Sequence, residues 1–239
     1  MTSTIVVGAK GRMGQLVCAE VQADDELELV GTYDVDNINE LDETAAAADL
    51  VIDFSNPAAL PHVIAYASRT GAAVTSGTTG LTEEDLQSLR ELGVTNRVVW
   101  ASNYSLGVAV LRRVVAQAAK ALGAWDVEIV ETHHNQKADA PSGTAKALLE
   151  AVDPEGSRPV VSGRDGIVGA RTQGEIGMHA IRGGTVAGTH EVHFFGTDEE
   201  LTLTHRATSR QIFVSGAVAC AKKLVKAGIG FHSFDELMF

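Results

Sequence analysis

The sequence predicts an α/β protein in two parts: a parallel sheet flanked by helices, and a smaller α+β part built on a mixed, open sheet. Two observations predict this arrangement. Through the first hundred residues, short apolar strand segments alternate with helical segments, which is typical of βαβ units. Between residues 176 and 206, three candidate strands follow one another without a helix. Such a run favours a second sheet with strands of both directions.

The segments of the first part follow in a regular order. Pro57 suits the first turn of a helix, and Thr82 followed by Asp85 resembles a capping box, which marks another helix start. The strands are predicted at Thr4–Gly8, Leu27–Asp34, Leu50–Phe54, Ala72–Ser76 and Val98–Ala101, and the helices from Gly11 to about Ala23, at Pro57–Arg69 and at Thr82–Leu92.

The second part begins with a helix near Ser105 and changes character at Asp126. The helix carries apolar residues at every fourth position, which predicts one buried stripe. The stripe consists of Leu106, Val110, Val114, Ala118 and Leu122. A strand from Val127 to His133 follows, then a short helix after Pro141 and a loop over residues 153–175, which are rich in Gly and Pro.

Three strands and a final helix complete the chain. The strands are predicted at Ile176–Arg182, Val186–Phe195 and Glu200–Arg206, and the helix at Ser209–Lys226, with Gly228 as its stop. We expect this helix to return to the first part. The predicted domains are therefore residues 1–105 completed by 212–239, and residues 106–211.

Composition limits the function classes. The chain has 239 residues, of which 45% are hydrophobic and 21% charged, as in ordinary globular proteins. No apolar run approaches the roughly 20 residues of a membrane span, and the N-terminus lacks a signal-peptide pattern, so we expect a cytoplasmic protein. Cys18 and Cys220 lie in separate predicted helices, which argues against a disulfide framework. The net charge of −12 disfavours nucleic acid, and an anionic ligand would need a local cluster of positive groups.

A glycine-rich turn joins the first strand to the first helix. Such a turn lets the backbone approach a pyrophosphate at the helix N-terminus, and Asp34 ends the second strand about 20 residues later, where an acid binds ribose hydroxyls. A plain glycine turn without a ligand is the alternative. The pattern favours a Rossmann-type dinucleotide domain, with contacts from Gly8, Ala9, Lys10, Gly11, Arg12, Met13 and Asp34.

The cofactor is NADH or NADPH on this evidence. Asp34 favours NADH, because a 2′-phosphate would meet a like charge, whereas Lys10 and Arg12 could attract a phosphate.

Two loops at the carboxyl edge of the sheet are further candidates for cofactor binding. Their alternative roles are a plain turn and a hinge. These loops are Gly77-Thr78-Thr79-Gly80, whose hydroxyls and amides could hold the nicotinamide carboxamide, and Ala101-Ser102-Asn103-Tyr104.

A cluster of positive side chains precedes the short helix of the second part. His133, His134 and Lys137 lie within five residues, and Ser142-Gly143-Thr144 then opens the helix. A helix N-terminus with small residues binds anions, a lysine suits a carboxylate, and a histidine can donate a proton near neutral pH. A solvated loop is the alternative. Adjacent histidines cannot easily share one zinc ion, so no metal is expected. His190 and His193 fit opposite faces of a strand and are expected to be structural or to face a cavity.

These blocks resemble the 4-hydroxy-tetrahydrodipicolinate (dihydrodipicolinate) reductase family of bacterial diaminopimelate and lysine biosynthesis. The resemblance covers nearly the whole chain. It is carried by Gly8–Gly14, Asp53-Phe54-Ser55, Gly77–Gly80, Ala101–Gly107, Ser209-Arg210 and most specifically by Glu131-Thr132-His133-His134-Asn135-Gln136-Lys137-Ala138-Asp139-Ala140-Pro141-Ser142-Gly143-Thr144-Ala145. The segment 153–175 is short for the family.

The resemblance implies a fold, a reaction and residue roles. It implies a Rossmann domain completed by the C-terminal helix, a mixed-sheet substrate domain, and a homotetramer joined through those sheets. His133 and Lys137 would be catalytic, His134, Gly143 and Thr144 would bind a small dicarboxylate, and the glycine turn, Asp34, Gly77–Thr79 and Ala101–Tyr104 would bind the cofactor. The expected reaction is reduction of 4-hydroxy-tetrahydrodipicolinate to tetrahydrodipicolinate with hydride from NAD(P)H, assisted by a cationic Lys137 and a protonated His133.

Two other functions remain open at this point. A different nicotinamide dehydrogenase would need another substrate motif, such as a catalytic cysteine in a loop at the sheet edge. A non-catalytic dinucleotide sensor would keep the glycine turn but would have no use for His133, His134 and Lys137 together.

Overall fold

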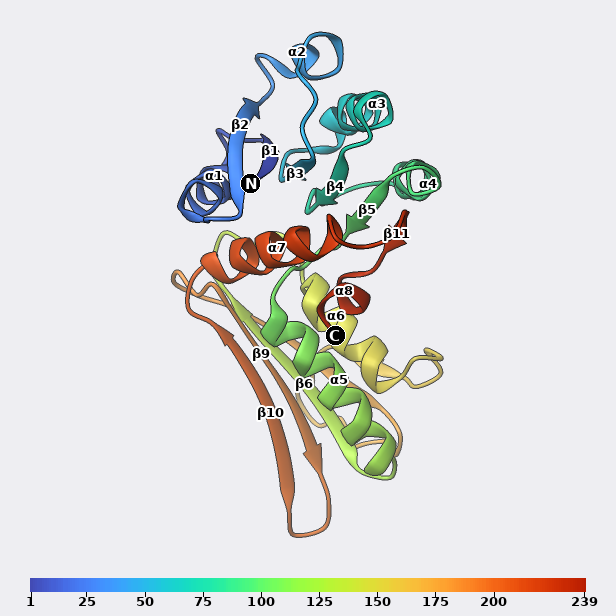
Figure 1. The fold of residues 1–239 in the computed structure, drawn as a ribbon. Coiled ribbons are helices and arrows are strands. Elements are labelled where there is room, and N and C mark those ends of the chain that lie inside the picture. Colours follow the sequence, from blue (N-terminus) through green and yellow to red (C-terminus); the bar gives the residue numbers. More distant parts are fainter. The chain divides into compact units, whose positions relative to one another are not determined.

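The computed structural model describes residues 1–239, the whole printed sequence, and the chain divides into two compact units. Unit 1 comprises Met1–Leu106 and Gln211–Phe239, and unit 2 comprises Gly107–Arg210. Unit 1 holds a six-stranded sheet and unit 2 a five-stranded sheet, and Figure 1 labels their elements. The fold class predicted from the sequence is confirmed.

All strands of the first sheet are parallel, in the order β11-β5-β4-β3-β1-β2. The chain moves outward from β1 to β2 and then returns to the other side of β1 with β3, so the strand order reverses between β1 and β3. Ligands of open α/β sheets bind beside such a reversal. The bounds are Thr2–Val7 (β1), Leu27–Tyr33 (β2), Leu50–Asp53 (β3), Ala73–Ser76 (β4), Arg97–Trp100 (β5) and Gly230–His232 (β11).

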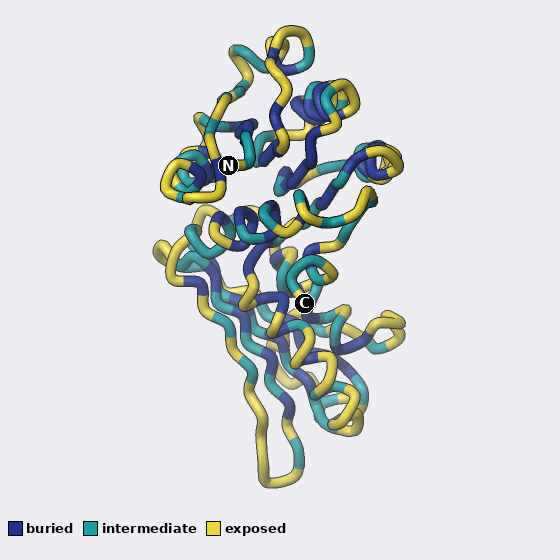
Figure 2. Tube along the Cα trace, in the orientation of Figure 1, coloured by how far each residue is buried: buried dark blue, intermediate teal, exposed yellow.

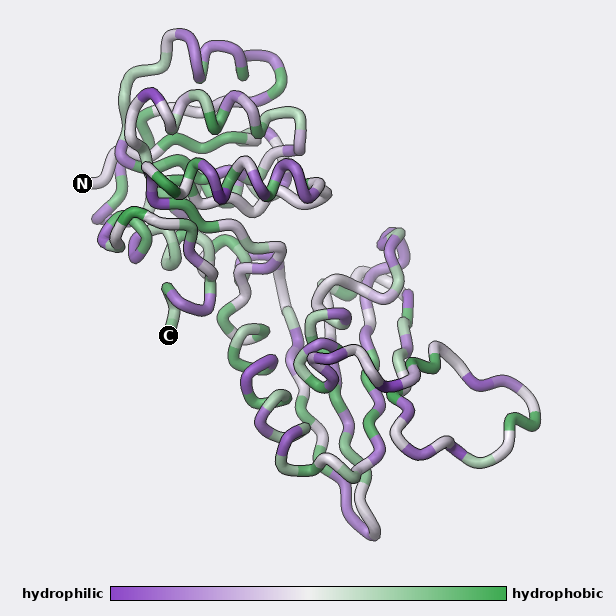
Figure 3. Tube along the Cα trace, turned by 90° about the vertical axis from the view of Figure 1, so that its right-hand side faces the viewer, coloured by the Kyte–Doolittle hydropathy of each residue, from purple (hydrophilic) through white to green (hydrophobic).

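Helices cover both faces of this sheet, and the central strands are therefore buried on both sides. Near the labelled N-terminus in Figure 3, hydrophobic and hydrophilic residues alternate along these helices, as they do in amphipathic helices. The predicted capping box is present, because Thr82 and Asp85 bond each other's backbone at the start of α4. The bounds are Arg12–Ala23 (α1), Ile38–Glu43 (α2), Pro57–Ala59 (η1, a 3-10 turn), Leu60–Thr70 (α3), Glu83–Leu92 (α4), Gln211–Leu224 (α7) and Phe234–Met238 (α8).

The helix α7 packs against α1 and against β3, β4 and β5. Its Gly216 lies so close to the loop after β5 that a Cβ atom there would fall 1.8 Å from the Tyr104 carbonyl oxygen. Lys222 pairs with Asp24 at 2.8 Å, which ties α7 to the end of α1. Residues far apart in the sequence thus share one core. The sequence did not predict α2, α8 or β11, each of which has six residues or fewer.

The sheet of unit 2 has the order β10-β9-β6-β8-β7, with β6 parallel to β8 and antiparallel to β9. Two helices cover one face and enclose a core that includes Leu111, Ile129, Leu148 and Phe194. The bounds are Leu106–Ala121 (α5), Asp126–His133 (β6), Gly143–Val152 (α6), Val160–Val161 (β7), Ile176–Arg182 (β8), Gly188–Phe195 (β9) and Glu200–Ala207 (β10). Only the two-residue β7 interrupts the predicted loop over 153–175.

The buried stripe predicted for α5 is wrong for its first three residues, whereas Ala118 and Leu122 pack against the core. Leu106, Val110 and Val114 are 41–45% exposed, whereas Val108, Leu111 and Val115 are buried. A spacing of exactly four residues drifts around a helix of 3.6 residues per turn, so it does not follow one face. The buried positions alternate between steps of three and four residues.

The uncovered face of this sheet carries an ion-pair cluster. Glu128 accepts hydrogen bonds from Arg164, Arg171 and His179 at 2.7–3.1 Å. Burial would raise the pKa of Glu128, but these donors outweigh it and lower the pKa to about 2. The edge strand β10 is exposed along much of its length, as Figure 2 shows. None of the helices is both long and apolar enough to cross a membrane.

Candidate active site

The glycine turn after β1 fits closely against its neighbours. Gly8 has a φ of +78°, and a Cβ atom on it would lie 2.5 Å from the Phe54 carbonyl oxygen. A Cβ on Gly14 would lie 2.0 Å from the carbonyl oxygen of Gly8. The turn therefore tolerates no side chain at either glycine. Gly11 caps α1 without any side-chain hydrogen bond, and this leaves amides of the first turn for an anion.

A cavity of about 220 Å³ lies beside this turn. Its lining includes Gly8, Gly11, Asp34 and Phe54. Asp34 is held in place because its carboxylate accepts hydrogen bonds from the amides of Lys10 and Val35, each at 2.8 Å. The uncapped helix start, the side-chain-free turn and the acid at the cavity wall fit a dinucleotide.

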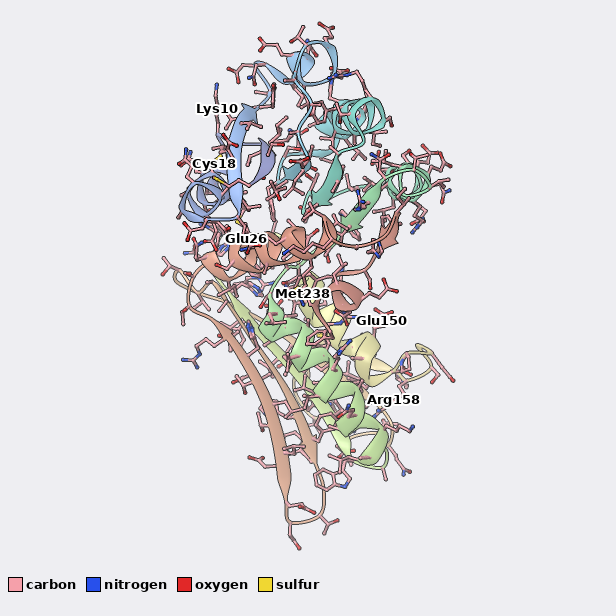
Figure 4. All side chains as sticks on the ribbon, viewed as in Figure 1. Lys10, Cys18, Glu26, Glu150, Arg158 and Met238 are labelled. Atoms are coloured by element: carbon pink, nitrogen blue, oxygen red, sulfur yellow. The ribbon has the colours of Figure 1, made fainter.

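The other turn residues surround the glycines. Lys10 and Arg12 are exposed, and Ala9 and Met13 are partly exposed. The Lys10 ammonium pairs with Asp36 at 2.5 Å, so a second carboxylate already neutralises it. Figure 4 labels Lys10 in the turn and Cys18 on α1. Both Cys18 and Cys220 are free thiols.

A buried carboxylate joins the loops at the carboxyl edge of the first sheet. Asp53 is fully buried and accepts hydrogen bonds from the hydroxyls of Ser55, Ser76 and Thr78 at 2.5–2.8 Å. Burial raises the pKa of Asp53, and the three hydroxyls oppose that rise. The sequence predicts that the Thr78 hydroxyl could hold a ligand, but in the structure this hydroxyl donates a hydrogen bond to Asp53. Thr79 is exposed and Gly77 is partly exposed at this edge.

Tyr104 is a core residue. Its ring is 1% exposed, packs edge-on against Phe234 at 5.3 Å, and donates a hydrogen bond from its hydroxyl to the Ser76 carbonyl at 2.7 Å. The preceding residues of this loop, Ala101, Ser102 and Asn103, are partly or fully exposed. The Tyr104 side chain therefore positions the loop and does not itself face a ligand.

In unit 2, a buried glutamate lies at the centre of the charged cluster. Glu131 is fully buried on the core face of β6, and its carboxylate accepts a hydrogen bond from His133 Nδ1 at 2.6 Å. Arg182 on β8 binds both carboxylate oxygens at 2.8 Å. The backbone amide of Ser142, the residue that caps α6, donates a fourth hydrogen bond at 3.0 Å. One carboxylate therefore joins β6, β8 and the start of α6.

The charge balance of this cluster determines its protonation. Burial alone would raise the pKa of Glu131, but the donors, with Arg182 foremost, outweigh it and lower the pKa, so Glu131 is ionised. Burial lowers the pKa of His133, and the nearby Lys137 and Arg182 add to this effect, while Glu131 opposes it. The resting His133 is therefore neutral at pH 7. The protonated His133 expected from the sequence differs from this resting state.

A second histidine lies against the first. The rings of His133 and His190 are 5.1 Å apart and nearly perpendicular. His190 Nε2 lies 3.0 Å from the Ser142 hydroxyl, which also caps α6 by accepting from the Ala145 amide. Burial lowers the pKa of His190 to about 4, so it is neutral. The prediction that His190 is structural or faces a cavity, with His193 on the other face, agrees with this placement.

Lys137 and the start of α6 supply positive charge beside this cluster. The Lys137 ammonium pairs with Asp139 at 2.8 Å, with 21% of the Lys137 side chain exposed. The helix α6 begins at Gly143, where a Cβ atom would meet only open space. Thr144 follows in the first turn, and the His134 amide donates to the Val186 carbonyl at 2.8 Å. A carboxylate that bound Lys137 would displace Asp139 from it.

Sequence reasoning missed three of the residues that organise these sites. It gave no role to Asp53, Glu131 or Arg182. The signal for Glu131 was its place in the alternating pattern, since it shares a face of β6 with the buried Ile129 and so had to be a buried acid. The pairing with Arg182 depends on the register of β6 and β8, and its two residues lie 51 positions apart in the sequence.

The described residues contain no cluster of three or more metal-binding side chains.

Residues 2–104 match the family model for the N-terminus of dihydrodipicolinate reductase, and residues 107–238 match the model for its C-terminus. The 4-hydroxy-tetrahydrodipicolinate reductase of Akkermansia muciniphila is 40% identical over 243 residues, which cover 100% of this chain and 98% of that protein. That of Caldanaerobacter subterraneus subsp. tengcongensis is 38% identical over 248 residues, which cover 100% and 98%.

Solved structures show the same fold. A dipicolinate-bound dihydrodipicolinate reductase from Paenisporosarcina sp. has a TM-score of 0.80 at 24% identity, with 100% of both chains covered. A probable dehydrogenase from Thermotoga maritima has a TM-score of 0.61 at 12% identity, with 98% of this chain and 92% of that chain covered. With two family models that together span almost the whole sequence, and full-length relatives of this identity, the chain belongs to the dihydrodipicolinate reductase family.

Proposed function

We propose that the protein reduces 4-hydroxy-tetrahydrodipicolinate to tetrahydrodipicolinate in lysine and diaminopimelate biosynthesis, with NADH as the preferred hydride donor. The observation that carries the substrate assignment is the cluster of His133, Lys137 and the α6 N-terminus, an anion site in a chain of net charge −12. A non-catalytic sensor would not need this cluster. Neither cysteine lies in a loop at the sheet edge, which disfavours a thiol-dependent dehydrogenase.

Each unit contributes a separate part of the chemistry. In unit 1, the glycine turn and Asp34 bind the dinucleotide, and the exposed parts of Gly77–Thr79 and Ala101–Asn103 orient its nicotinamide end. In unit 2, Gly143, Thr144 and His134 bind the carboxylates of the substrate. The bound cofactor supplies a hydride. The protein supplies orientation and positive charge where the substrate gains electrons.

Lys137 and His133 act on the charge that develops in the substrate. The 4-hydroxyl of the substrate first leaves as water, which creates a conjugated C=C–C=N unit. Hydride arrival at ring C4 then pushes electron density along this unit, and the enamine so formed must gain a proton. The Lys137 ammonium stabilises that density more strongly than it stabilises the ground state. His133 is neutral at rest, but a bound dicarboxylate beside it raises its pKa, so the complex can hold the proton that the enamine takes.

The preference for NADH rests on two carboxylates. Asp34 lies at the cavity wall, where a ribose 2′-hydroxyl can donate to it and a 2′-phosphate would be repelled. Lys10, which could otherwise attract that phosphate, is paired with Asp36.

We also propose a cytoplasmic homotetramer. The two free cysteines suit a reducing compartment, and cell fractionation would test this location. The support for assembly is the open face of the second sheet together with β10, an eight-residue edge strand that is exposed along much of its length. Long exposed edge strands and open sheet faces are protected in folded proteins by pairing or covering.

Replacement of Lys137 by alanine should lower kcat by about 10²–10³, because one electrostatic donor is lost. The measurement is substrate-dependent oxidation of NADH by absorbance, with enzymatically generated 4-hydroxy-tetrahydrodipicolinate. Lys146→Ala is the matched control, since Lys146 is an exposed lysine on α6. Near-normal turnover in Lys137→Ala would refute the role of Lys137, and no turnover in the wild-type protein would refute the substrate.

Replacement of Asp34 by asparagine should raise the kcat/KM ratio of NADPH to NADH by about tenfold, which corresponds to about 1.4 kcal/mol of removed repulsion. Steady-state kinetics with both cofactors measures the ratio. Asp25→Asn changes the net charge equally at the opposite end of β2 and should leave the ratio unchanged. An unchanged ratio in both variants would mean that Asp34 does not discriminate between the cofactors.

Sedimentation velocity should give the mass of four chains for the wild-type protein. Val130→Arg, in the middle of the open face of β6, should dissociate the tetramer, because it introduces a charge there. Val160→Arg, on the short edge strand β7, is the control and should remain tetrameric. A monomeric wild-type protein would contradict the assembly.

A further inference from the structure

A buried carboxylate remains charged only where hydrogen-bond donors stabilise it, and Glu131 is surrounded by such donors. Its oxygens receive both arms of Arg182, the Ser142 amide and His133 Nδ1, so every direction around the carboxylate is used. Since the carboxylate is ionised and can only accept, the nitrogen of His133 that faces it must carry a hydrogen. This arrangement selects one of the two neutral tautomers of the imidazole.

The other ring nitrogen of His133, Nε2, faces a glycine on the neighbouring strand β9, and this glycine has no side chain to cover it. A Cβ atom on Gly188 would lie 3.0 Å from His133 Nε2, so any side chain at this position would crowd that nitrogen. The glycine keeps Nε2 open. The groups that face His133 are Glu131 on its own strand, Arg182 on β8, His190 on β9 and Lys137 in the following loop.

We propose that Glu131, neutralised by Arg182, is a positioning residue that holds His133 as its Nδ1–H tautomer, so that Nε2 is the nitrogen that exchanges a proton with the substrate. The proposal rests on the proposed reductase function. The same carboxylate fixes the cap of α6 through the Ser142 amide, so one buried group sets both the proton-transfer nitrogen and the helix start that receives the substrate carboxylate.

Glu131 also stabilises the cation that His133 becomes when Nε2 takes up a proton. The proton arrives at Nε2 while Nδ1–H keeps its bond to the carboxylate, and it then leaves from Nε2 to the carbon of the enamine. No other bond of the protein changes. An imidazolium beside a carboxylate is favoured over one beside a neutral amide. The pKa of His133 in the substrate complex therefore depends on Glu131.

The test compares Glu131→Gln with the wild-type enzyme by kcat, KM and the pH dependence of kcat. We expect kcat to fall by a factor on the order of 10²–10⁴, as for other histidines that lose the acid that orients them. The acidic form of His133 is required, so kcat falls as pH rises through its pKa in the complex. Without the carboxylate this pKa drops, and the alkaline limb should move to lower pH by about one unit or more.

A purely structural role would lower the active fraction and leave the position of the limb unchanged. Glu131→Asp keeps the charge and should return the limb toward that of the wild-type enzyme. Glu128→Gln is the matched control, because Glu128 lies three residues earlier on β6, faces the other side of the sheet and also binds arginines. It should leave the limb unchanged.

The double variant Glu131→Gln, Arg182→Gln removes both charges and guards against misfolding from an unpaired arginine. Tm reports that each variant is folded, and NADH binding reports that unit 1, which holds the cofactor cavity, is unaffected by the changes in unit 2. A limb moved to lower pH in folded Glu131→Gln supports the proposal, and the shift should be smaller in the double variant, because Arg182 itself lowers the pKa of His133. An unshifted limb, or wild-type kcat in Glu131→Gln, overturns it. Absence of turnover in the wild-type enzyme would instead refute the proposed function. Nitrogen-15 NMR of His133 would then decide whether Nδ1 or Nε2 carries the hydrogen.

Discussion

Unit 2 of this protein depends on one buried ionic contact, the pair of Glu131 with Arg182. A lone carboxylate in the core of unit 2 would take up a proton or destabilise the fold. Two hydrogen bonds from the guanidinium keep it charged, and the charge then holds His133 and the Ser142 amide. Because those contacts come from three different segments, loss of the pair would disturb His133 and the start of α6 at once.

Unit 1 uses the same physical device for its own site. Asp53 ends β3 as a fully buried carboxylate and gathers the hydroxyls of Ser55, Ser76 and Thr78. These hydroxyls belong to the end of β4 and to the loops after β3 and β4, where Phe54 leaves no room for a side chain on Gly8 or Gly77. In both units an acid near the end of a central strand therefore fixes the loops that carry function. The difference is the partner: neutral hydroxyls hold Asp53, and a guanidinium holds Glu131.

The sequence predicted the features that depend on local chemistry. The alternation of strands and helices, the glycine turn and the capping box at Thr82 can be read from neighbouring residues, and the family resemblance covered the full chain. The features that depend on register could not be read in this way. Glu131 pairs with Arg182, which lies 51 residues later in the sequence. Tyr104 is buried against the C-terminal α8. The first residues predicted for the buried face of α5 are exposed. Short elements such as α2 and β11 have too few residues for a periodic signal.

In the proposed arrangement, Glu131 holds a neutral His133 with its hydrogen on Nδ1 and its lone pair on Nε2. Nitrogen-15 NMR of the histidine-labelled protein at mildly alkaline pH, with His133 assigned by its absence in His133→Gln, measures this directly. We expect a proton-coupled Nδ1 and an unprotonated Nε2 for His133. A protonated Nε2 with a bare Nδ1, or an imidazolium that persists at that pH, would contradict it.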